Sequence, residues 1–433
     1  MKNYKFLVPI ALILVFAASI YMKIDSNADR QRAYAESVEA ARDARSMGVW
    51  VDAEKYYKEA LQNNDYPELW VELGEMYVEA NMSRKAISWG EDAVSAYPKA
   101  TCVYEYLASV YALYGEYVAC FNLYDKAAKL GIVSEKLEAE IDSIEYVYSE
   151  TGQYENAGIY SGGYCPVQTN SYWGYTDTTG KLTVKTQYQY AGPFSSDVAP
   201  VIDQDGEAYF IDAEGNKKIA VPNLKNIQVL GLLENNVFSA YDGEVWNFYN
   251  REGECLFGGY EDASSIGNGV AAVKSNGKWT IVNSAGEAII SDTFDSVISD
   301  EKGIVCRLDR LFVEKSGLFY MIDSKGERIT EQAYQNADIF NANGWAAVEI
   351  DGAWGFVNVD GEIEIEPQYT NAKSFSNGYA AVETVNGWGY IDTDNNLVLG
   401  GTYVNAMDFN SNGAAYINEV AGWKLIVLYK YNH

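Results

Sequence analysis

The spacing of apolar and polar residues changes twice along the chain. An uncharged apolar run occupies residues 6–22. Apolar residues then recur at helical spacing over residues 31–160, and short strand-like runs separated by turns fill residues 163–433. The pattern therefore predicts an apolar N-terminal helix, an α-helical domain and an all-β domain, in that order.

The apolar run reads as a membrane-spanning segment. Phe6 to Met22 contains no charge, and at about 1.5 Å per residue it reaches roughly 25 Å, close to the thickness of a bilayer core. Lys2 and Lys5 precede the run, so residues 1–5 are expected to stay cytoplasmic while the rest is exported. The sequence predicts a single-pass signal anchor at the cell membrane. A cleaved signal peptide, which would leave a secreted protein, is the alternative because small residues occur at 17–19.

The helical region repeats with a period close to 34 residues. Its second copy carries Trp70, Leu73, Gly74, Tyr77, Ala86, Ala93 and Pro98, and its third carries Tyr104, Leu107, Ala108, Tyr111, Cys120 and Ala127. An earlier copy fits Ala41, Ala44, Gly48, Ala53, Tyr57 and Ala60, and a degraded fourth fits Ile141, Ile144, Tyr148, Gly152 and Ala157. This pattern resembles the tetratricopeptide (TPR) repeat, in which small residues lie where two antiparallel helices touch.

The resemblance implies an α-solenoid with a groove along the first helix of each repeat, where such arrays bind peptides. The candidate groove residues are mostly acidic and favour a basic peptide as partner. The alternative is that the repeats act only as a structural spacer. The candidate residues are Arg42, Arg45, Glu68, Glu75, Glu79 and Glu105.

The β region repeats a second motif. Its first copy is Trp173-Gly174-Tyr175-Thr176-Asp177-x-x-Gly180, and the Asp/Asn position recurs at 177, 212, 250, 283, 323, 358 and 392. Each copy is joined to an aromatic-led segment such as Tyr369-Thr370-Asn371-Ala372-x-x-Phe375 and an Ala-rich strand. The motif resembles the bacterial WG (Trp-Gly) repeat family.

The turn Asp/Asn-x-x-Gly predicts a tight hairpin, so each unit supplies three or four short strands. Seven to eight such units suggest a closed β-propeller-like ring, because closure hides the edge strands. The last strand-like run, Trp423 to Tyr429, has no unit after it and could pair with the first unit to close the ring. An open stack of β-hairpin sheets is the alternative.

Composition removes several classes of function. The chain has 32 Lys+Arg against 61 Asp+Glu, a net charge of −29, which argues against nucleic acid as a partner. The single histidine is His433, which disfavours imidazole-based catalysis and histidine metal sites. No cofactor-binding or metal-binding motif is present, and the loop after Asp392 lacks the glycine and glutamate of a calcium loop.

These observations predict a non-catalytic, membrane-anchored, extracytoplasmic binding or scaffold protein whose partner is a protein or peptide. Binding of a cell-wall or other glycan by the β domain is an alternative, since the chain has 10 Trp and 36 Tyr. The repeated tryptophans are nevertheless expected to pack in the core. A glycoside hydrolase is a remote alternative that rests on paired carboxylates such as Asp300 and Glu301.

Overall fold

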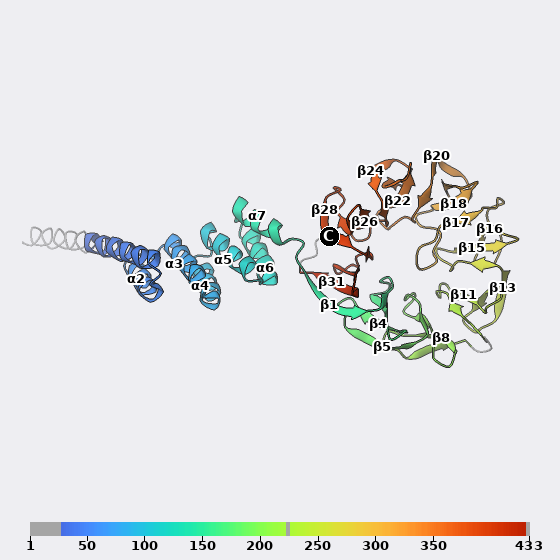
Figure 1. The fold of residues 1–433 in the computed structure, drawn as a ribbon, viewed down its shortest axis with the longest axis horizontal. Coiled ribbons are helices and arrows are strands. Elements are labelled where there is room, and N and C mark those ends of the chain that lie inside the picture. Colours follow the sequence, from blue (N-terminus) through green and yellow to red (C-terminus); the bar gives the residue numbers. More distant parts are fainter. Residues whose placement is uncertain (1–26, 222–225, 430–433) are drawn as a thin grey trace, which may run out of the picture. The chain divides into compact units, whose positions relative to one another are not determined.

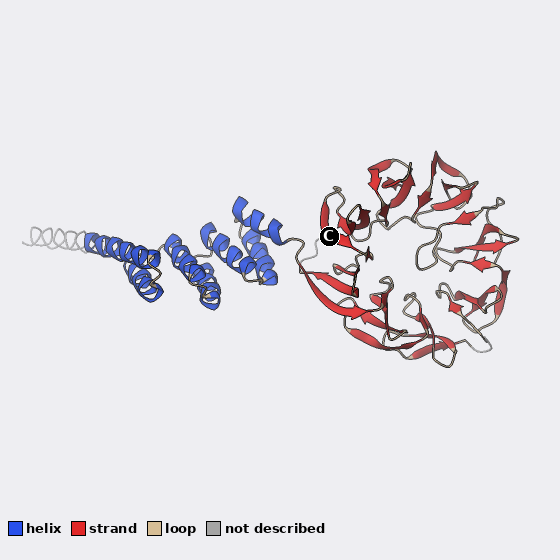
Figure 2. Cartoon of the chain, in the orientation of Figure 1, coloured by secondary structure: helices blue, strands red, loops and turns tan. Residues whose placement is uncertain are grey.

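The chain divides into two compact units between Val147 and Tyr148. A computed structural model describes residues 27–221 and 226–429. The predicted membrane-spanning segment at 6–22 lies outside these residues. Within them, no helix is both long and apolar enough to cross a bilayer. Among the described residues, helices are confined to the first unit and strands to the second (Figure 2).

The first unit is a succession of short helices (Figure 1). Each of α2 to α7 buries one face, and their apolar residues form two adjoining clusters. The helices are a first one described over 27–46, then α2 (Trp50–Asn63), α3 (Pro67–Glu79), α4 (Ser83–Ala96), α5 (Thr101–Leu113), α6 (Tyr117–Lys129) and α7 (Glu135–Ile144).

Small residues permit close approach of these helices, as the repeat pattern predicts. The Cys120 thiol on α6 donates a hydrogen bond to the Ala108 carbonyl on α5 at 3.5 Å. A Cβ on Gly74 would come within 2.3 Å of the Tyr106 ring, whose hydroxyl donates to the Ala86 carbonyl. A larger side chain at these positions would push the helices apart.

The fourth helical copy is only half helical, and the helical region ends before the predicted residue 160. Its first helix is α7, which Ser134 caps by accepting a hydrogen bond from the Leu137 amide. Tyr148 and Gly152, which the repeat pattern assigned to this copy, lie in β1 (Tyr148–Tyr154). The β unit therefore begins at Tyr148 and not near residue 163, because β1 forms its hydrogen bonds with a strand at the far end of the chain. Local spacing of apolar residues cannot reveal such a partner.

The second unit contains eight sheets in the part of the chain that the structure describes. We number them as blades along the chain. Blade 1 consists of β2 (Asn156–Ala157), β3 (Tyr164–Thr169), β4 (Tyr172–Asp177) and β5 (Leu182–Tyr188), and blade 2 of β6 (Tyr190–Ala191), β7 (Ala199–Ile202), β8 (Ala208–Ile211) and β9 (Lys217–Ala220). Blade 3 consists of β10 (Val229–Leu230), β11 (Val237–Tyr241), β12 (Trp246–Asn250) and β13 (Cys255–Tyr260). Blade 4 consists of β14 (Asp262–Ala263), β15 (Val270–Ser275) and β16 (Lys278–Asn283).

The remaining blades continue the same antiparallel order. Blade 5 consists of β17 (Ser296–Val297), β18 (Leu311–Lys315), β19 (Leu318–Ile322) and β20 (Arg328–Tyr334), and blade 6 of β21 (Asn336–Ala337), β22 (Trp345–Ile350), β23 (Ala353–Asn358) and β24 (Ile363–Tyr369). Blade 7 consists of β25 (Asn371–Ala372), β26 (Ala380–Thr384), β27 (Gly387–Ile391) and β28 (Leu397–Tyr403). Blade 8 consists of β29 (Asn405–Ala406), β30 (Ala414–Glu419), β31 (Gly422–Leu428) and β1.

The eight blades form a closed β-propeller (Figure 1). Blade 8 takes its outer strand from the beginning of the unit, since β1 pairs antiparallel with β31 from Tyr148↔Leu428 to Tyr154↔Trp423. The predicted closed ring is confirmed, and the open stack of hairpins is wrong. The last strand closes the ring as predicted, although it pairs with β1 and not with blade 1.

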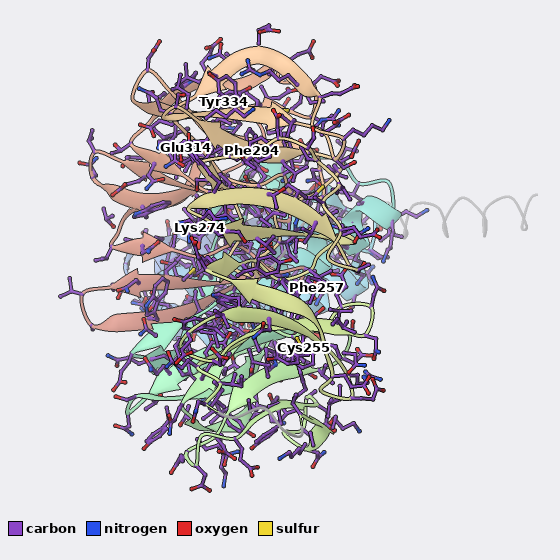
Figure 3. All side chains as sticks on the ribbon, turned by 90° about the vertical axis from the view of Figure 1, so that its right-hand side faces the viewer. Cys255, Phe257, Lys274, Phe294, Glu314 and Tyr334 are labelled. Atoms are coloured by element: carbon purple, nitrogen blue, oxygen red, sulfur yellow. The ribbon has the colours of Figure 1, made fainter. Side chains whose placement is uncertain are left out.

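Neighbouring blades pack face to face around the ring. In an edge-on view, Cys255 and Phe257 of β13, Lys274 of β15 and Glu314 of β18 succeed one another along it (Figure 3). Apolar side chains fill the spaces between blades; Phe210 of blade 2, for example, meets Phe238 of blade 3 at 5.2 Å between ring centres. The short first strand of each blade lies nearest the centre, so the residues after it line the central channel (Figure 1).

Candidate functional site

In the part of the chain that the structure describes, each unit offers a large concave site. In the helical unit a groove of about 700 Å³ lies between residues of the first helix, α3, α5 and α7. In the propeller a cavity of about 980 Å³ occupies the central channel. Both volumes fall in the range typical of ligand sites, which is about 300–1,000 Å³.

The helical groove has an apolar floor. It is lined by Val71 and Val78 of α3, Val110 and Leu113 of α5, and Ile144 of α7. Leu113 is 62% exposed and therefore accessible to a ligand. An apolar floor of this kind suits the apolar side chains of a peptide.

Three of the six predicted groove residues line this groove, namely Arg45, Glu75 and Glu79. Arg42, Glu68 and Glu105 do not line it. The Glu105 carboxylate instead accepts a hydrogen bond from the Ser134 hydroxyl at 2.5 Å. Half of the predicted residues therefore line the groove. Helical spacing predicts which face of a helix a residue lies on, but it does not predict how far the groove extends along that face.

The charges at the groove are largely paired with each other. The Arg45 guanidinium lies 2.7 Å from Glu79 and 3.4 Å from Glu75. The hydrogen bond from Arg45 lowers the pKa of Glu79. Outside the groove, Arg42 is bonded to Glu72 at 2.7 Å. Arg45 therefore partly neutralises the acidic lining that the sequence predicted. Glu72, which was not among the predicted residues, is the acid that pairs with Arg42.

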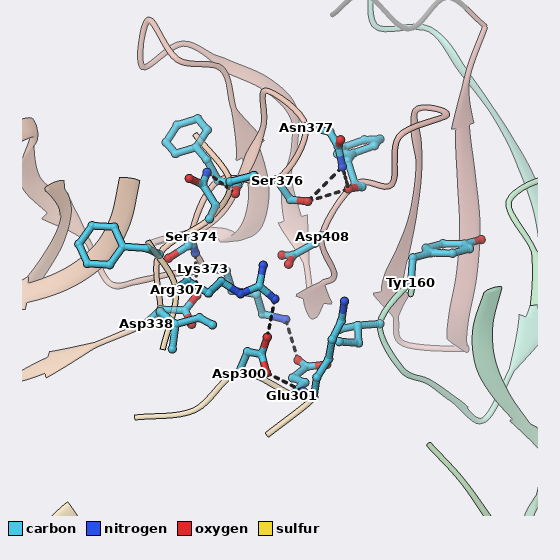
Figure 4. A pocket seen from close by; sticks show the side chains of 18 of the residues that line it. Tyr160, Asp300, Glu301, Arg307, Asp338, Lys373, Ser374, Ser376, Asn377 and Asp408 are labelled. Atoms are coloured by element: carbon cyan, nitrogen blue, oxygen red, sulfur yellow. Dashed lines mark hydrogen bonds and ion pairs between the residues drawn. The ribbon is translucent and has the colours of Figure 1, made fainter. Parts of the chain in front are cut away.

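The channel cavity carries charges of both signs on one side of the propeller. They come from blades 5 to 8, where each lies in the segment that follows the first strand of its blade (Figure 4). In blade 5 this segment connects β17 to β18. The charged lining residues are Asp300, Glu301, Lys302, Arg307, Asp338, Lys373 and Asp408.

Several of these charges have partners inside the cavity. Arg307 forms an ion pair with Asp300 at 2.8 Å, and Lys373 lies 3.7 Å from Glu301. The Asp338 carboxylate accepts the backbone amides of Ile339 and Ser374. Burial nevertheless raises the pKa of Asp338, so these two hydrogen bonds only partly replace water.

Asp408 and Lys302 differ from these neighbours. Neither side chain makes a hydrogen bond or an ion pair with any residue that the structure describes. Burial raises the pKa of Asp408 to about 7, and burial lowers the pKa of Lys302. Each of the two charges also favours the charged form of the other.

Sequence reasoning missed most of this cavity, although a signal for it was present. In blades 6 to 8 the segment after the first strand has the form Asn-Ala-x-x-Phe, and the two variable positions hold Asp338, Lys373 and Asp408. These positions vary between repeats while the rest of the unit is kept for packing. Once the repeats are known to close around a channel, charged residues at such variable positions indicate which side chains line that channel.

The prediction that the repeated tryptophans pack in the core is confirmed in part. Trp354, Trp388 and Trp423 are buried. Trp173, Trp246 and Trp279 are partly buried and pack at the edges of buried clusters. The glycine that follows is needed because a Cβ on Gly355 would meet the Ile365 carbonyl oxygen at 2.5 Å. The glycine of the WG motif is thus explained by the close approach of two strands, and the motif alone does not indicate a ligand-binding surface.

The repeated motif also matches a known protein family. Four segments match the family described as the WG containing repeat, at residues 173–206, 246–279, 354–387 and 388–419. No curated protein matches the chain.

Several solved structures are similar to parts of the chain at low identity. BamB from Moraxella catarrhalis is 11% identical with a TM-score of 0.45, over 65% of this chain and 99% of that one. PorZ, a surface component of the type-IX secretion system of Porphyromonas gingivalis, is 11% identical with a TM-score of 0.36, over 63% of this chain and 42% of that one. A tetratricopeptide repeat protein from Parabacteroides merdae is 21% identical with a TM-score of 0.21, over 26% of this chain and 52% of that one.

Proposed function

We propose that this is a non-catalytic binding or scaffold protein whose helical unit binds a peptide segment of a protein partner. The apolar run at residues 6–22 anchors it in a membrane, with the two repeat units on the extracytoplasmic side. The helical pairs form a TPR-like array, and the observation that carries the proposal is the groove with its apolar floor and exposed Leu113.

The groove favours a particular kind of peptide. It offers contacts to apolar side chains, and its charged lining consists of three acids, Glu75, Glu79 and Glu140, against two bases, Arg45 and Lys136. Because Arg45 is already bonded to both acids, a basic residue of the peptide finds an excess of negative charge there. The expected ligand is therefore a segment with apolar anchors and a basic residue next to them.

Leu113→Asp is the variant that tests the groove. Peptides selected from a randomised 12-residue library against the purified protein are synthesised, and their affinities are measured by fluorescence anisotropy. A carboxylate at position 113 faces the apolar floor, so we expect affinity to fall at least tenfold, about 1.4 kcal/mol. Leu130→Asp is the matched control, because Leu130 also ends a helix, is 47% exposed and does not line the groove.

A second pair of variants tests the charge preference. Glu75→Lys should weaken the selected basic peptides, whereas Glu105→Lys, which lies outside the groove, should leave them unchanged. Equal binding by the Leu113 and Leu130 variants, or failure to select any peptide, contradicts the proposed groove.

A further inference from the structure

The propeller channel holds two opposite charges that face one cavity without pairing. Asp408, which is labelled in Figure 4, follows the first strand of blade 8. Lys302 lies in the segment after β17 of blade 5. Neither side chain forms a hydrogen bond or an ion pair with the described residues. Both residues are partly exposed, and a charge that has lost part of its hydration is stabilised by an oppositely charged partner.

The other charges around them are already engaged. Asp300 is paired with Arg307, Glu301 with Lys373, and Asp338 accepts two backbone amides. The groups left over are thus one carboxylate and one ammonium.

We propose that the central cavity of the propeller binds a small zwitterion that carries both an ammonium and a carboxylate group, as a free amino acid does. The ligand ammonium pairs with Asp408, and the ligand carboxylate pairs with Lys302. One molecule then satisfies both charges. A cavity of about 980 Å³ has room for it.

Other ligand classes satisfy fewer of these groups. Among the described residues, no three His, Cys, Asp or Glu side chains converge as a metal site requires. A simple organic cation leaves Lys302 unpaired, and an anion leaves Asp408 unpaired. A neutral polyol compensates neither charge. The pKa directions agree with this assignment, because burial shifts both Asp408 and Lys302 toward their neutral forms.

The inference is independent of the peptide groove, since the cavity lies wholly in the propeller unit. Either site can therefore fail its test without affecting the other.

Isothermal titration calorimetry on the purified full chain tests the proposal. The twenty standard amino acids are titrated one by one, and each binder is compared with its N-acetyl derivative and its carboxamide. We expect at least one amino acid to bind, and both blocked derivatives to bind at least tenfold more weakly.

Two variants assign the ends of the ligand. Asp408→Asn should weaken the amino acid at least tenfold and remove most of the discrimination against its N-acetyl derivative. Lys302→Gln should do the same for the carboxamide. Asp394→Asn is the matched control, because Asp394 is an exposed turn residue that does not line the cavity and should leave affinity unchanged.

Three results overturn the proposal: no amino acid binds, blocked derivatives bind as tightly as the free amino acid, or folded Asp408→Asn and Lys302→Gln retain wild-type affinity and discrimination. Circular dichroism establishes that the variants are folded. If one of them does not fold, the comparison of free and blocked ligands on the wild-type chain decides alone.

Discussion

At the scale of single residues, the repeated turn residues satisfy the conformation and hydrogen bonding of the backbone and do not form a ligand site. In the turn after β4, Asp177 Oδ1 accepts the amides of Thr179 and Lys181, and Gly180 adopts a φ of +81°. Asp392 bonds the amides of Asp394 and Asn396 in the same way, so the loop that most resembled a calcium site is a hairpin turn. The side chain at the Asp/Asn position thus replaces the hydrogen bonds that the tight turn cannot form.

The turn glycine has a second role that a matched pair of variants separates. Gly352 and Gly361 both have a φ of +82°, but a Cβ on Gly352 meets nothing within 4 Å, while one on Gly361 comes within 2.8 Å of Thr330 in the preceding blade. We expect Gly352→Ala to lower the free energy of unfolding by about 1 kcal/mol through backbone strain. Gly361→Ala should cost about 1–3 kcal/mol more, because the β-branched Thr330 cannot turn away.

Urea denaturation followed by tryptophan fluorescence measures both values. Equal destabilisation by the two variants would show that the contact between blades contributes nothing.

At the scale of elements, the ring is closed by strands from both ends of the unit. β1 completes blade 8, and the contact between blades 8 and 1 then buries Tyr416 of β30 against Thr176 of β4. Their hydroxyl oxygens lie 2.8 Å apart and both residues are fully buried. A buried polar pair of this kind specifies which blades become neighbours, because either hydroxyl left alone is penalised.

A double-mutant cycle tests this closure contact. Tyr416→Phe and Thr176→Val should each lower the free energy of unfolding by about 1–2 kcal/mol, since each leaves a buried hydroxyl without its partner. The double variant should cost less than the sum of the two, by on the order of 1 kcal/mol. The unfolding free energies come from urea denaturation, and strict additivity would mean that the hydrogen bond does not couple the blades.

At the scale of the whole molecule, the two units use repetition differently. The helical repeats leave an open groove, whereas the β repeats close on themselves and turn their variable positions toward a common channel. As a result, Asp408 is surrounded by charged and titratable groups from several blades, and its pKa becomes a property of the assembled ring. The groups that influence it, or that it influences, are Glu301, Lys302, Asp338, Lys373 and Tyr390.

This environment makes stability depend on pH in a defined window. The pKa of Asp408 in the folded protein is about 7, raised mainly by burial from the ordinary 3.8. The folded state therefore holds a proton that the unfolded state releases between about pH 4 and 7, so Asp408 lowers stability as pH rises through this range. Above pH 7 the penalty is fully present, and below pH 4 it is absent.

Asp408→Asn removes the titrating group while keeping its shape. We expect the variant to be more stable than the wild type at pH 8, by roughly 4 kcal/mol for a shift of about three pKa units, and nearly equal to it at pH 4. Other acids whose pKa is lowered, such as Glu79 and Asp177, are present in both proteins, so their contributions cancel in the comparison. Urea midpoints at both pH values measure the difference, and a variant that is less stable at pH 8 would contradict the cause assigned to the shift.

The sequence by itself determined the order of the two repeat types, the hairpin turns, the burial of the repeated tryptophans and the closing of the ring by its last strand. These features follow from local rules, namely periodicity, turn geometry and the need to cover strand edges. The tertiary structure alone decided that residues 148–154 form a strand, that Glu105 lies outside the groove, and that Asp408 and Lys302 share a cavity. Each of these depends on segments far apart in the chain, whose proximity is set only when the blades and helices have packed.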